Sequence, residues 1–269
     1  DTAWVPASDD QSRRAQVTDS LFERQHLFMV ESFSTRIFKS GRSKEIVKAS
    51  KVSGMKEASV FMLALQYQPF TFYEPLLEVS GKKYVNPISR NSEALYFFSL
   101  EDTLFAGKDT VYVISYKPQR NKIFEGLSGV LYISAPDYAI QNAIAEPARD
   151  EGTFRIKIQQ QYKKTPGGQW FPEQLNTDLR FLNLQVPGNK LVGESRTYVS
   201  AIEINPEVRN REFDEVSLEV ETEASSQSES YWDSVRIERL NRQERRTYQV
   251  IDSISRRNNL SLRLKLAES

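Results

Sequence analysis

Residues 109–146, DTVYVISYKPQRNKIFEGLSGVLYISAPDYAIQNAIAE, decide the fold of this chain. They contain three apolar runs, at residues 111–116, 127–133 and 138–144, and each run is rich in Val, Ile or Tyr. Turn-forming residues bound these runs, which is typical of β-strands. Only residues 135–137 separate the second run from the third, and so short a link permits only an antiparallel hairpin. The stretch therefore predicts antiparallel strands at the centre of the chain.

The first of these strands is apolar at nearly every position. Because side chains alternate along a strand, residues 112, 114 and 116 share one face, and residues 111 and 113 share the other. We therefore expect this strand to be covered on both sides. The residues predicted to be buried in the central hairpins are Val113, Leu131 and Ile140.

The flanking sequence extends the β pattern in both directions. Hairpins are predicted around the turns at residues 40–43 and 80–81, and a strand is predicted at residues 95–102. After residue 147, apolar and polar residues alternate in TFRIKIQQQYKK, and two further strands follow the turns at 165–168 and 187–189. Strands of this length can curve into a half-barrel. Helices are predicted at residues 8–25, at residues 57–67 and after residue 231.

The C-terminal part changes composition. Residues 205–230 are rich in Glu, include a short run with strand character at 216–220, and contain ASSQSES at 224–230, which resembles a flexible link. Further on, Asn241 and Glu244 have the spacing of a helix capping box. The ending LSLRLKL alternates like a strand but has flanking residues that favour helix, and we favour helix. We therefore predict a domain at residues 1–204, and an acidic linker with a helical extension at 205–269.

Composition excludes several classes of protein. The 269 residues carry 36 Lys plus Arg and 36 Asp plus Glu, and this balance gives no reason to expect a nucleic-acid partner. The chain has no cysteine, so disulfides and thiolate chemistry are excluded. No apolar run approaches the roughly 18 residues that span a bilayer as a helix. The chain begins at Asp1, which we interpret as the start of a processed or truncated product.

No constellation of catalytic or metal-binding residues is visible in the sequence. His26 is the only histidine, and its neighbours suggest a structural or surface role. With one His and no Cys, a zinc site is excluded. Glu101 and Asp102 are adjacent on a predicted strand, so we expect their side chains to point to opposite faces. We therefore predict no enzyme activity, no catalytic residue, no metal and no cofactor.

Aromatic residues provide the candidate ligand site. Several crowd around Pro69 and Pro75, and others lie on the nearby predicted strands. Such residues form either an aromatic core or the wall of an apolar cleft for a lipid or peptide. In the second case the Pro-bounded loop is free to open at the mouth of the cleft. The candidate ligand-binding residues are Phe70, Phe72, Tyr73, Phe98, Tyr112 and Tyr116.

Long phrases of the sequence resemble one family. They include MVESFSTRIFKSGRSKE, QPFTFYE, YFFSLEDTL, DTVYVISYKPQR and FEGLSGVLYIS. The chain resembles the middle, periplasmic region of a Bacteroidota outer-membrane family of unknown function. Members of that family carry a carboxypeptidase-regulatory-like domain before this region and a C-terminal outer-membrane barrel after it. The resemblance names no catalytic residue.

The order of the predicted elements is also similar to the LolA/LolB lipoprotein-carrier fold, which is an unclosed β-barrel with helices on its concave side. We therefore predict an α+β fold with a curved antiparallel sheet of about eight or more strands, forming a half β-barrel with a few packed helices. The two resemblances imply a non-enzymatic module, in the periplasm and tethered to the outer membrane. Its expected partners are a lipid or acyl chain and the outer-membrane barrel of the same polypeptide. The alternatives are a pure scaffold preceding the barrel, or a hydrolase acting on cell-envelope material.

Overall fold

The computed structural model describes residues 26, 29–39, 41–53, 68–106, 109–149, 152, 154–186, 189–213 and 217–257. The helices predicted at 8–25 and 57–67, and the ending LSLRLKL, lie outside these residues. The chain divides into two compact units. Unit 1 comprises Asp1–Met62 and Glu203–Ser269, and unit 2 comprises Leu63–Ile202.

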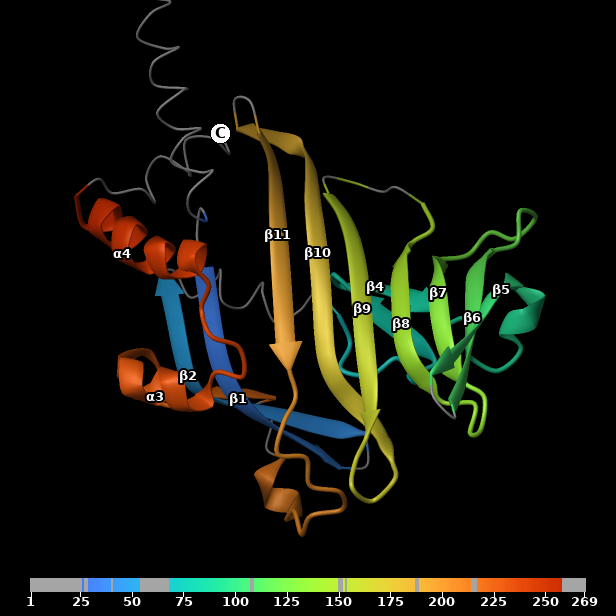
Figure 1. The fold of residues 1–269 in the computed structure, drawn as a ribbon, viewed down its shortest axis with the longest axis horizontal. Helices are drawn as coiled ribbons and strands as arrows, with labels where there is room; N and C mark the ends of the chain where they lie inside the picture. Colours follow the sequence, from blue (N-terminus) through green and yellow to red (C-terminus); the bar gives the residue numbers. More distant parts are fainter. Residues whose placement is uncertain are drawn as a thin grey trace, which may run out of the picture. The chain divides into compact units, whose positions relative to one another are not determined.

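Unit 2 is built on one antiparallel sheet in which each strand pairs with the next along the chain (Figure 1). The sheet has seven strands and is not closed into a barrel, so β5 and β11 form its two edges. The strands predicted in this part of the chain are confirmed, although we expected about eight or more in the sheet. The strands are β5 (Tyr96–Ala106), β6 (Asp109–Pro118), β7 (Leu127–Ser134), β8 (Ile140–Pro147), β9 (Phe154–Lys164), β10 (Trp170–Val186) and β11 (Asn189–Tyr198).

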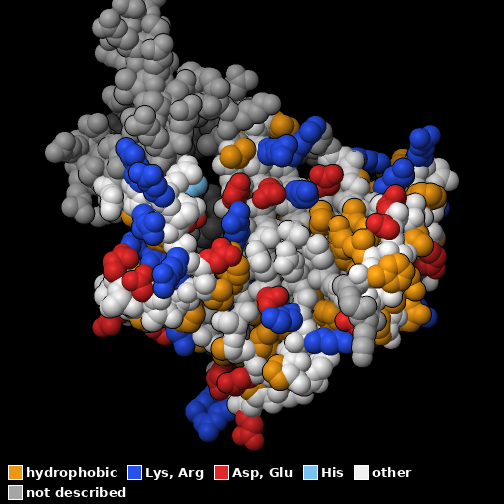
Figure 2. Space-filling model, viewed as in Figure 1, with side chains coloured by type: hydrophobic (Ala, Val, Ile, Leu, Met, Phe, Trp, Pro, Cys, Tyr) orange, Lys and Arg blue, Asp and Glu red, His pale blue; other side chains and the backbone are white. Residues whose placement is uncertain are grey.

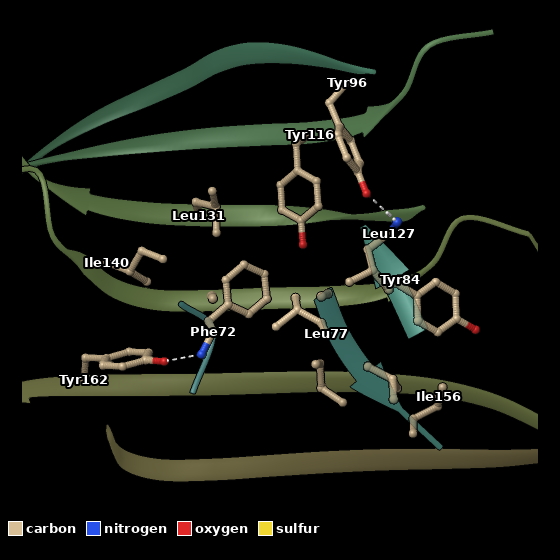
Figure 3. Packing of buried hydrophobic residues seen from close by; sticks show 14 of the residues in the cluster. Phe72, Leu77, Tyr84, Tyr96, Tyr116, Leu127, Leu131, Ile140, Ile156 and Tyr162 are labelled. Carbon is tan, nitrogen blue, oxygen red and sulfur yellow. Dashed lines mark hydrogen bonds between the residues drawn. The ribbon is translucent and has the colours of Figure 1, made fainter. Parts of the chain in front are cut away.

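One face of this sheet, here called the inner face, packs against residues 68–86. That segment contains the hairpin of β3 (Leu76–Val79) and β4 (Lys82–Val85), and the 3-10 helix η1 (Ser92–Ala94) follows it. The predicted turn is confirmed: Ser80 and Gly81 both have positive φ, at 52° and 77°. Apolar side chains of this segment pack onto the inner face and complete the core. The core cluster includes Phe72, Leu77, Val79 and Tyr84 from this segment, and Tyr116, Leu131, Ile140, Ile156 and Tyr162 from the sheet (Figure 3).

The core confirms two of the three residues predicted to be buried. Leu131 and Ile140 lie in it, but the prediction for Val113 was wrong because that side chain is only half-buried. Val113 pairs with Tyr132 on the outer face of the sheet, away from residues 68–86. On the same face, however, Val111 is buried and pairs with the buried Ser134. The expectation that β6 is covered on both sides is therefore confirmed at Val111 but not at Val113.

Gly129 allows the Tyr116 side chain to pass close to β7, which a residue with a Cβ atom would prevent. It pairs with Tyr116 on one side and Ala145 on the other. The Tyr116 side chain lies buried here, and its hydroxyl donates a hydrogen bond to the Ile144 carbonyl oxygen at 3.0 Å. A Cβ atom at Gly129 would fall 1.9 Å from that oxygen and 2.9 Å from the tyrosine hydroxyl. The glycine therefore makes room for the tyrosine across β7.

Unit 1 joins the first hairpin of the chain to its C-terminal part. The predicted hairpin is confirmed as β1 (Met29–Lys39) and β2 (Arg42–Ser53). The short strand β12 (Leu218–Val220) pairs with β2 in parallel, and the remaining elements of this unit are η2 (Asn210–Glu212), η3 (Ala224–Ser226), α3 (Glu229–Val235) and α4 (Arg242–Arg257). This grouping differs from the predicted division at residues 204 and 205, because pairing between β2 and β12 brings the first hairpin into the C-terminal unit.

The segment ASSQSES has local structure that its composition did not reveal. Ala224 is buried at the start of η3, and the Ser228 hydroxyl caps α3 by accepting a hydrogen bond from the Tyr231 N–H at 3.2 Å. The segment therefore forms local structure, and its predicted flexibility remains a prediction. The capping box of α4 is confirmed, since the Asn241 N–H donates to the Glu244 carboxylate at 2.6 Å and the Glu244 N–H donates to the Asn241 side chain at 2.9 Å.

A partly buried ion pair holds the helices of unit 1 to its sheet. The Arg236 guanidinium, just after α3, donates two hydrogen bonds to the Glu31 carboxylate on β1, at 2.7 and 2.9 Å. The Tyr248 hydroxyl on α4 donates to the same carboxylate at 2.6 Å. Burial and this hydrogen bond raise the pKa of Tyr248. One carboxylate therefore connects β1 with both helices.

We predict that Gly129→Ala destabilises the protein by about 3 kcal/mol, because the added methyl group overpacks the core between β7 and β8. Gly193→Ala is the matched control, since a Cβ on that strand would meet Leu179 at an ordinary 3.5 Å. Chemical denaturation of both variants measures the difference. Equal losses for the two variants would contradict the role given to Gly129.

We also predict that Glu31→Gln costs about 2 kcal/mol and speeds amide exchange in α3 and α4, because it weakens three hydrogen bonds to a partly buried carboxylate, while Arg236 keeps Asp233 and Glu229 as partners. Glu173→Gln is the control, since it removes an exposed ion pair with Lys163 of 3.0 Å. Such surface pairs contribute about 0–1 kcal/mol. If Glu31→Gln leaves hydrogen exchange in unit 1 unchanged, the role given to the Glu31 carboxylate is contradicted.

Candidate functional site

The structure divides the six predicted ligand-binding residues between a closed core and an open edge. Phe72 is 0% exposed and Tyr116 is also buried, so both belong to the core of unit 2 (Figure 3). Phe70 and Tyr73 lie on the segment that covers the inner face. Phe98 and Tyr112 lie on β5 and β6, beyond that cover, and Phe98 is exposed. The six residues do not converge on one cavity.

Hydrogen bonds fix the loop that the sequence predicted to be free to open. The Phe72 N–H donates to the Tyr162 hydroxyl at 2.7 Å, and this hydroxyl donates to the Gln160 side chain at 2.8 Å (Figure 3). The Gln160 amide donates in turn to the Pro69 carbonyl at 2.7 Å, and the Asn86 amide donates to the Phe72 carbonyl at 2.5 Å. Gln160 and Asn86 are both fully buried. The loop is therefore part of the core rather than a lid.

Buried tyrosines of this core act as hydrogen-bonding groups and not as acids. Burial raises the pKa of Tyr96 to about 12, although its hydroxyl also accepts a hydrogen bond from the Leu127 N–H at 3.1 Å. Burial also raises the pKa of Tyr73, Tyr116 and Tyr162. All four phenols therefore remain neutral near pH 7.

Sequence reasoning missed most of the exposed apolar residues on β5. They face both sides of the strand: Phe98 and Leu100 pair with Tyr116 and Ile114 on the inner face, whereas Phe97 pairs with Lys117 on the outer face. Phe97 is 54% exposed, Leu100 62% and Phe105 80%. The signal was present in YFFSLEDTLFA, where apolar residues occupy both faces of a strand. We call the following set the apolar edge: Phe97, Phe98, Leu100, Leu104 and Phe105.

The outer face of the sheet continues this apolar surface across β6 to β8. Val113, Val130 and Ile144 are half-buried there. Toward β9 and β10 the same face becomes polar, and hydrogen-bonded amides form a row across the strands. The members of this row are Gln174, Asn176, Gln159 and Asn142, joined at 3.0 to 3.2 Å.

The carboxylates of Glu101 and Asp102 lie on one face, which corrects the prediction that they point to opposite faces. A β-bulge interrupts the pairing between Leu100 and Asp102. Asp102 pairs with Val113, and Glu101 accepts a hydrogen bond from Ser115, which is on the same face as Val113. Both acids are exposed at the open strand edge, so they do not form a catalytic pair in a cleft.

Other candidates for chemistry are explained by structure. The backbone N–H of His26 donates a hydrogen bond to the buried Thr247 hydroxyl at 2.9 Å. Within the described ranges, no group of three or more His, Cys, Asp or Glu residues could hold a metal ion. The pKa of Asp137 is lowered by hydrogen bonds from Lys164, Ser134 and Trp170, at an exposed turn. In the part of the chain that is described, no helix has the length and hydrophobicity needed to cross a membrane.

We predict that Gln160→Met loosens residues 68–73 and costs about 1–3 kcal/mol, because it leaves the Pro69 carbonyl and the Tyr162 hydroxyl short of a buried partner. Gln159→Met is the matched control, because Gln159 is adjacent to Gln160 in sequence but lies half-buried on the outer face. Hydrogen exchange of residues 68–73 measures the effect. Faster exchange in both variants, or in neither, would disprove the anchoring role.

Comparison with known proteins gives a family but no activity. Residues 7–200 match the model of a family of unknown function, DUF5686. No curated protein matches the chain, and no solved structure matches it. Because the matched residues make up well over half of the sequence, the protein belongs to the DUF5686 family of unknown function.

Proposed function

We propose that this chain is a non-enzymatic module whose β5 edge receives an extended segment of a partner polypeptide. The observation that carries the proposal is the apolar edge, where a strand of 11 residues exposes large apolar side chains on both of its faces. Unpaired backbone groups of an edge strand are a template for pairing with another strand. Apolar side chains on either side of that edge then bury against the added strand.

The two edges of the sheet differ in the way this proposal requires. Both edges carry exposed charges, Glu194 and Arg196 on β11 and Glu101 and Asp102 on β5, so the exposed apolar side chains are what distinguish the two edges. Among the described side chains of β11, Val192 is an exposed large apolar residue, at 59%. Exposed apolar surface that continues from β5 over the outer face of β6 to β8 is typical of an interaction site. The contrast favours β5 as the edge that is covered when the protein acts.

An apolar ligand such as a lipid or lipoprotein acyl chain is the alternative occupant of the same region. The proposed likeness to the unclosed barrel of LolA/LolB carriers favours it, because the inner face beside Phe98 and Leu100 is incompletely covered. Against it, residues 68–86 fill the middle of that face. Two depressions on unit 2, of about 400 and 390 Å³, are lined by no residue of β5 and are bordered by charged side chains. A polypeptide strand is the occupant that fits an edge without a cavity.

The resemblance to Bacteroidota outer-membrane proteins supports a place for this module in the cell envelope. On this proposal the module lies in the periplasm, tethered to the outer membrane. The added strand then comes from an envelope protein or from the same longer polypeptide, which carries the outer-membrane barrel. A scaffold role without a partner would leave the apolar edge exposed to aggregation.

Photocrosslinking in the cells that produce the protein tests the proposal. A benzoylphenylalanine replaces Phe105, and the matched control replaces Val192 on the opposite edge. We predict a crosslink from position 105 to one defined polypeptide segment, identified by mass spectrometry, and none from position 192. Leu100→Lys should abolish the crosslink without unfolding the protein, because it places a charge within the proposed interface.

Two outcomes would count against a strand partner. The first is equal crosslinking from positions 105 and 192. The second is binding of a fluorescent fatty-acyl probe to the purified chain that Leu100→Asp abolishes and Val192→Asp does not. The second result would assign the apolar edge to an acyl chain instead.

A further inference from the structure

A basic groove lies at the end of unit 2 where β6 and β8 end and β7 and β9 begin. It consists of the two depressions, which share Tyr84, Ser128, Ala148 and Arg149 and are therefore continuous. Lys and Arg side chains gather over the β6–β7 loop at this end of the sheet (Figure 2). The groove is distinct from the apolar edge, since no residue of β5 lines it.

The groove is strongly positive in a chain whose formal net charge is zero. Its acidic lining residues are Glu125 and Glu146, and Glu125 already pairs with Lys82 at 2.9 Å. The basic lining residues outnumber them: Lys82, Lys117, Arg120, Lys122, Arg149 and Arg155. Like charges held together in a depression raise the local concentration of anions. The arrangement therefore favours a ligand that carries negative charge.

Three of these cations are available to a ligand. Lys117 lies over the Phe97 ring at 5.7 Å. For Arg120, Lys122 and Arg149, in contrast, no acidic partner is found among the described residues, which leave out Asp150 and Glu151. Because an arginine guanidinium can donate two parallel hydrogen bonds, Arg120 and Arg149 suit a phosphate group better than a single point charge.

The β6–β7 loop, which carries Arg120 and Lys122, is held in place, and Arg149 follows β8. The Gln119 N–H donates to the Leu95 carbonyl at 2.8 Å, and the Ala148 N–H donates to the Gly126 carbonyl at 3.0 Å. The Val85 N–H donates to the Glu125 carbonyl at 2.9 Å, which fixes the loop to β4. Phe124 packs edge-on against Tyr96, with 5.3 Å between ring centroids. A preformed site loses less free energy on binding than one that must be ordered first.

We propose that the basic groove binds a phosphate-bearing anion, with Arg120 and Arg149 as its principal ligands and Lys122 as a third cation. Gly126, Tyr84 and Phe124 also line the site. The phosphate belongs either to a soluble phosphorylated molecule or to the headgroup of a lipid. Both carry the same charged group, and the two sources are separated by experiment.

Calorimetric titration of the whole chain with pyrophosphate tests the site. We expect saturable binding that weakens with added salt, and a loss of about tenfold in affinity for each of Arg120→Gln and Arg149→Gln. Arg196→Gln is the matched control, because it removes an exposed arginine on β11, outside the groove. The control should bind as the parent protein does.

Cosedimentation with vesicles distinguishes the two sources of phosphate. Binding to phosphatidylcholine vesicles only when they contain phosphatidylglycerol, with loss in the two groove variants, identifies a lipid headgroup. Pyrophosphate binding without vesicle binding identifies a soluble ligand. If the chain binds neither probe, or if Arg196→Gln weakens binding as much as the groove variants, the site is disproved. Circular dichroism of each variant verifies that its fold is retained.

Discussion

The buried hydrogen bonds of Gln160 and Tyr162 are the interaction on which the rest of unit 2 depends. They hold the Pro69 carbonyl and the Phe72 N–H against β9, so Phe72 and Leu77 fill the middle of the inner face. A buried glutamine is tolerated only where its partners are satisfied, and here they are also what positions the covering segment. This cover reaches β5 only at Tyr96, a buried residue whose hydroxyl donates a hydrogen bond to the Val85 carbonyl. The centre of the inner face is therefore filled, whereas most of the rest of β5 is exposed. The same contacts that make the core thus leave the apolar edge without a partner inside the described chain.

Much of this architecture could be predicted from the sequence. Alternating residues on β9 and turn residues such as Ser80 and Gly81 act locally, so strands, hairpins and the α4 capping box were confirmed. Features that depend on distant partners could not be read in the same way. The parallel pairing of β12 with β2 joins segments far apart in the chain. Composition gave no sign of the β-bulge on β5 or of the structure in ASSQSES, because a bulge and a cap depend on the neighbours that they contact.

The candidate site was predicted less well, for a physical reason. An aromatic residue contributes a similar hydrophobic pattern whether it lies in a core or at a surface, and only the covering layer decides between them. Phe72 lies under that layer, whereas Phe98 lies beyond it. The run on β5 contained the more useful signal, since apolar side chains on both faces of an edge strand imply cover on both faces. Among the described residues, no layer covers either face of this apolar run on β5 beyond Tyr96. This mismatch between the sequence and the contacts points to a partner.

The central claim is that the β5 edge is covered by a polypeptide strand when the protein acts. The most direct test measures hydrogen–deuterium exchange in two preparations: the purified chain, and the protein in membranes from the cells that make it. The account predicts that amides of β5 exchange much more slowly in the membrane preparation, while those of the charged edge strand β11 keep their rates. Identical exchange of β5 in the two preparations would contradict it, because an added strand must protect the backbone with which it pairs.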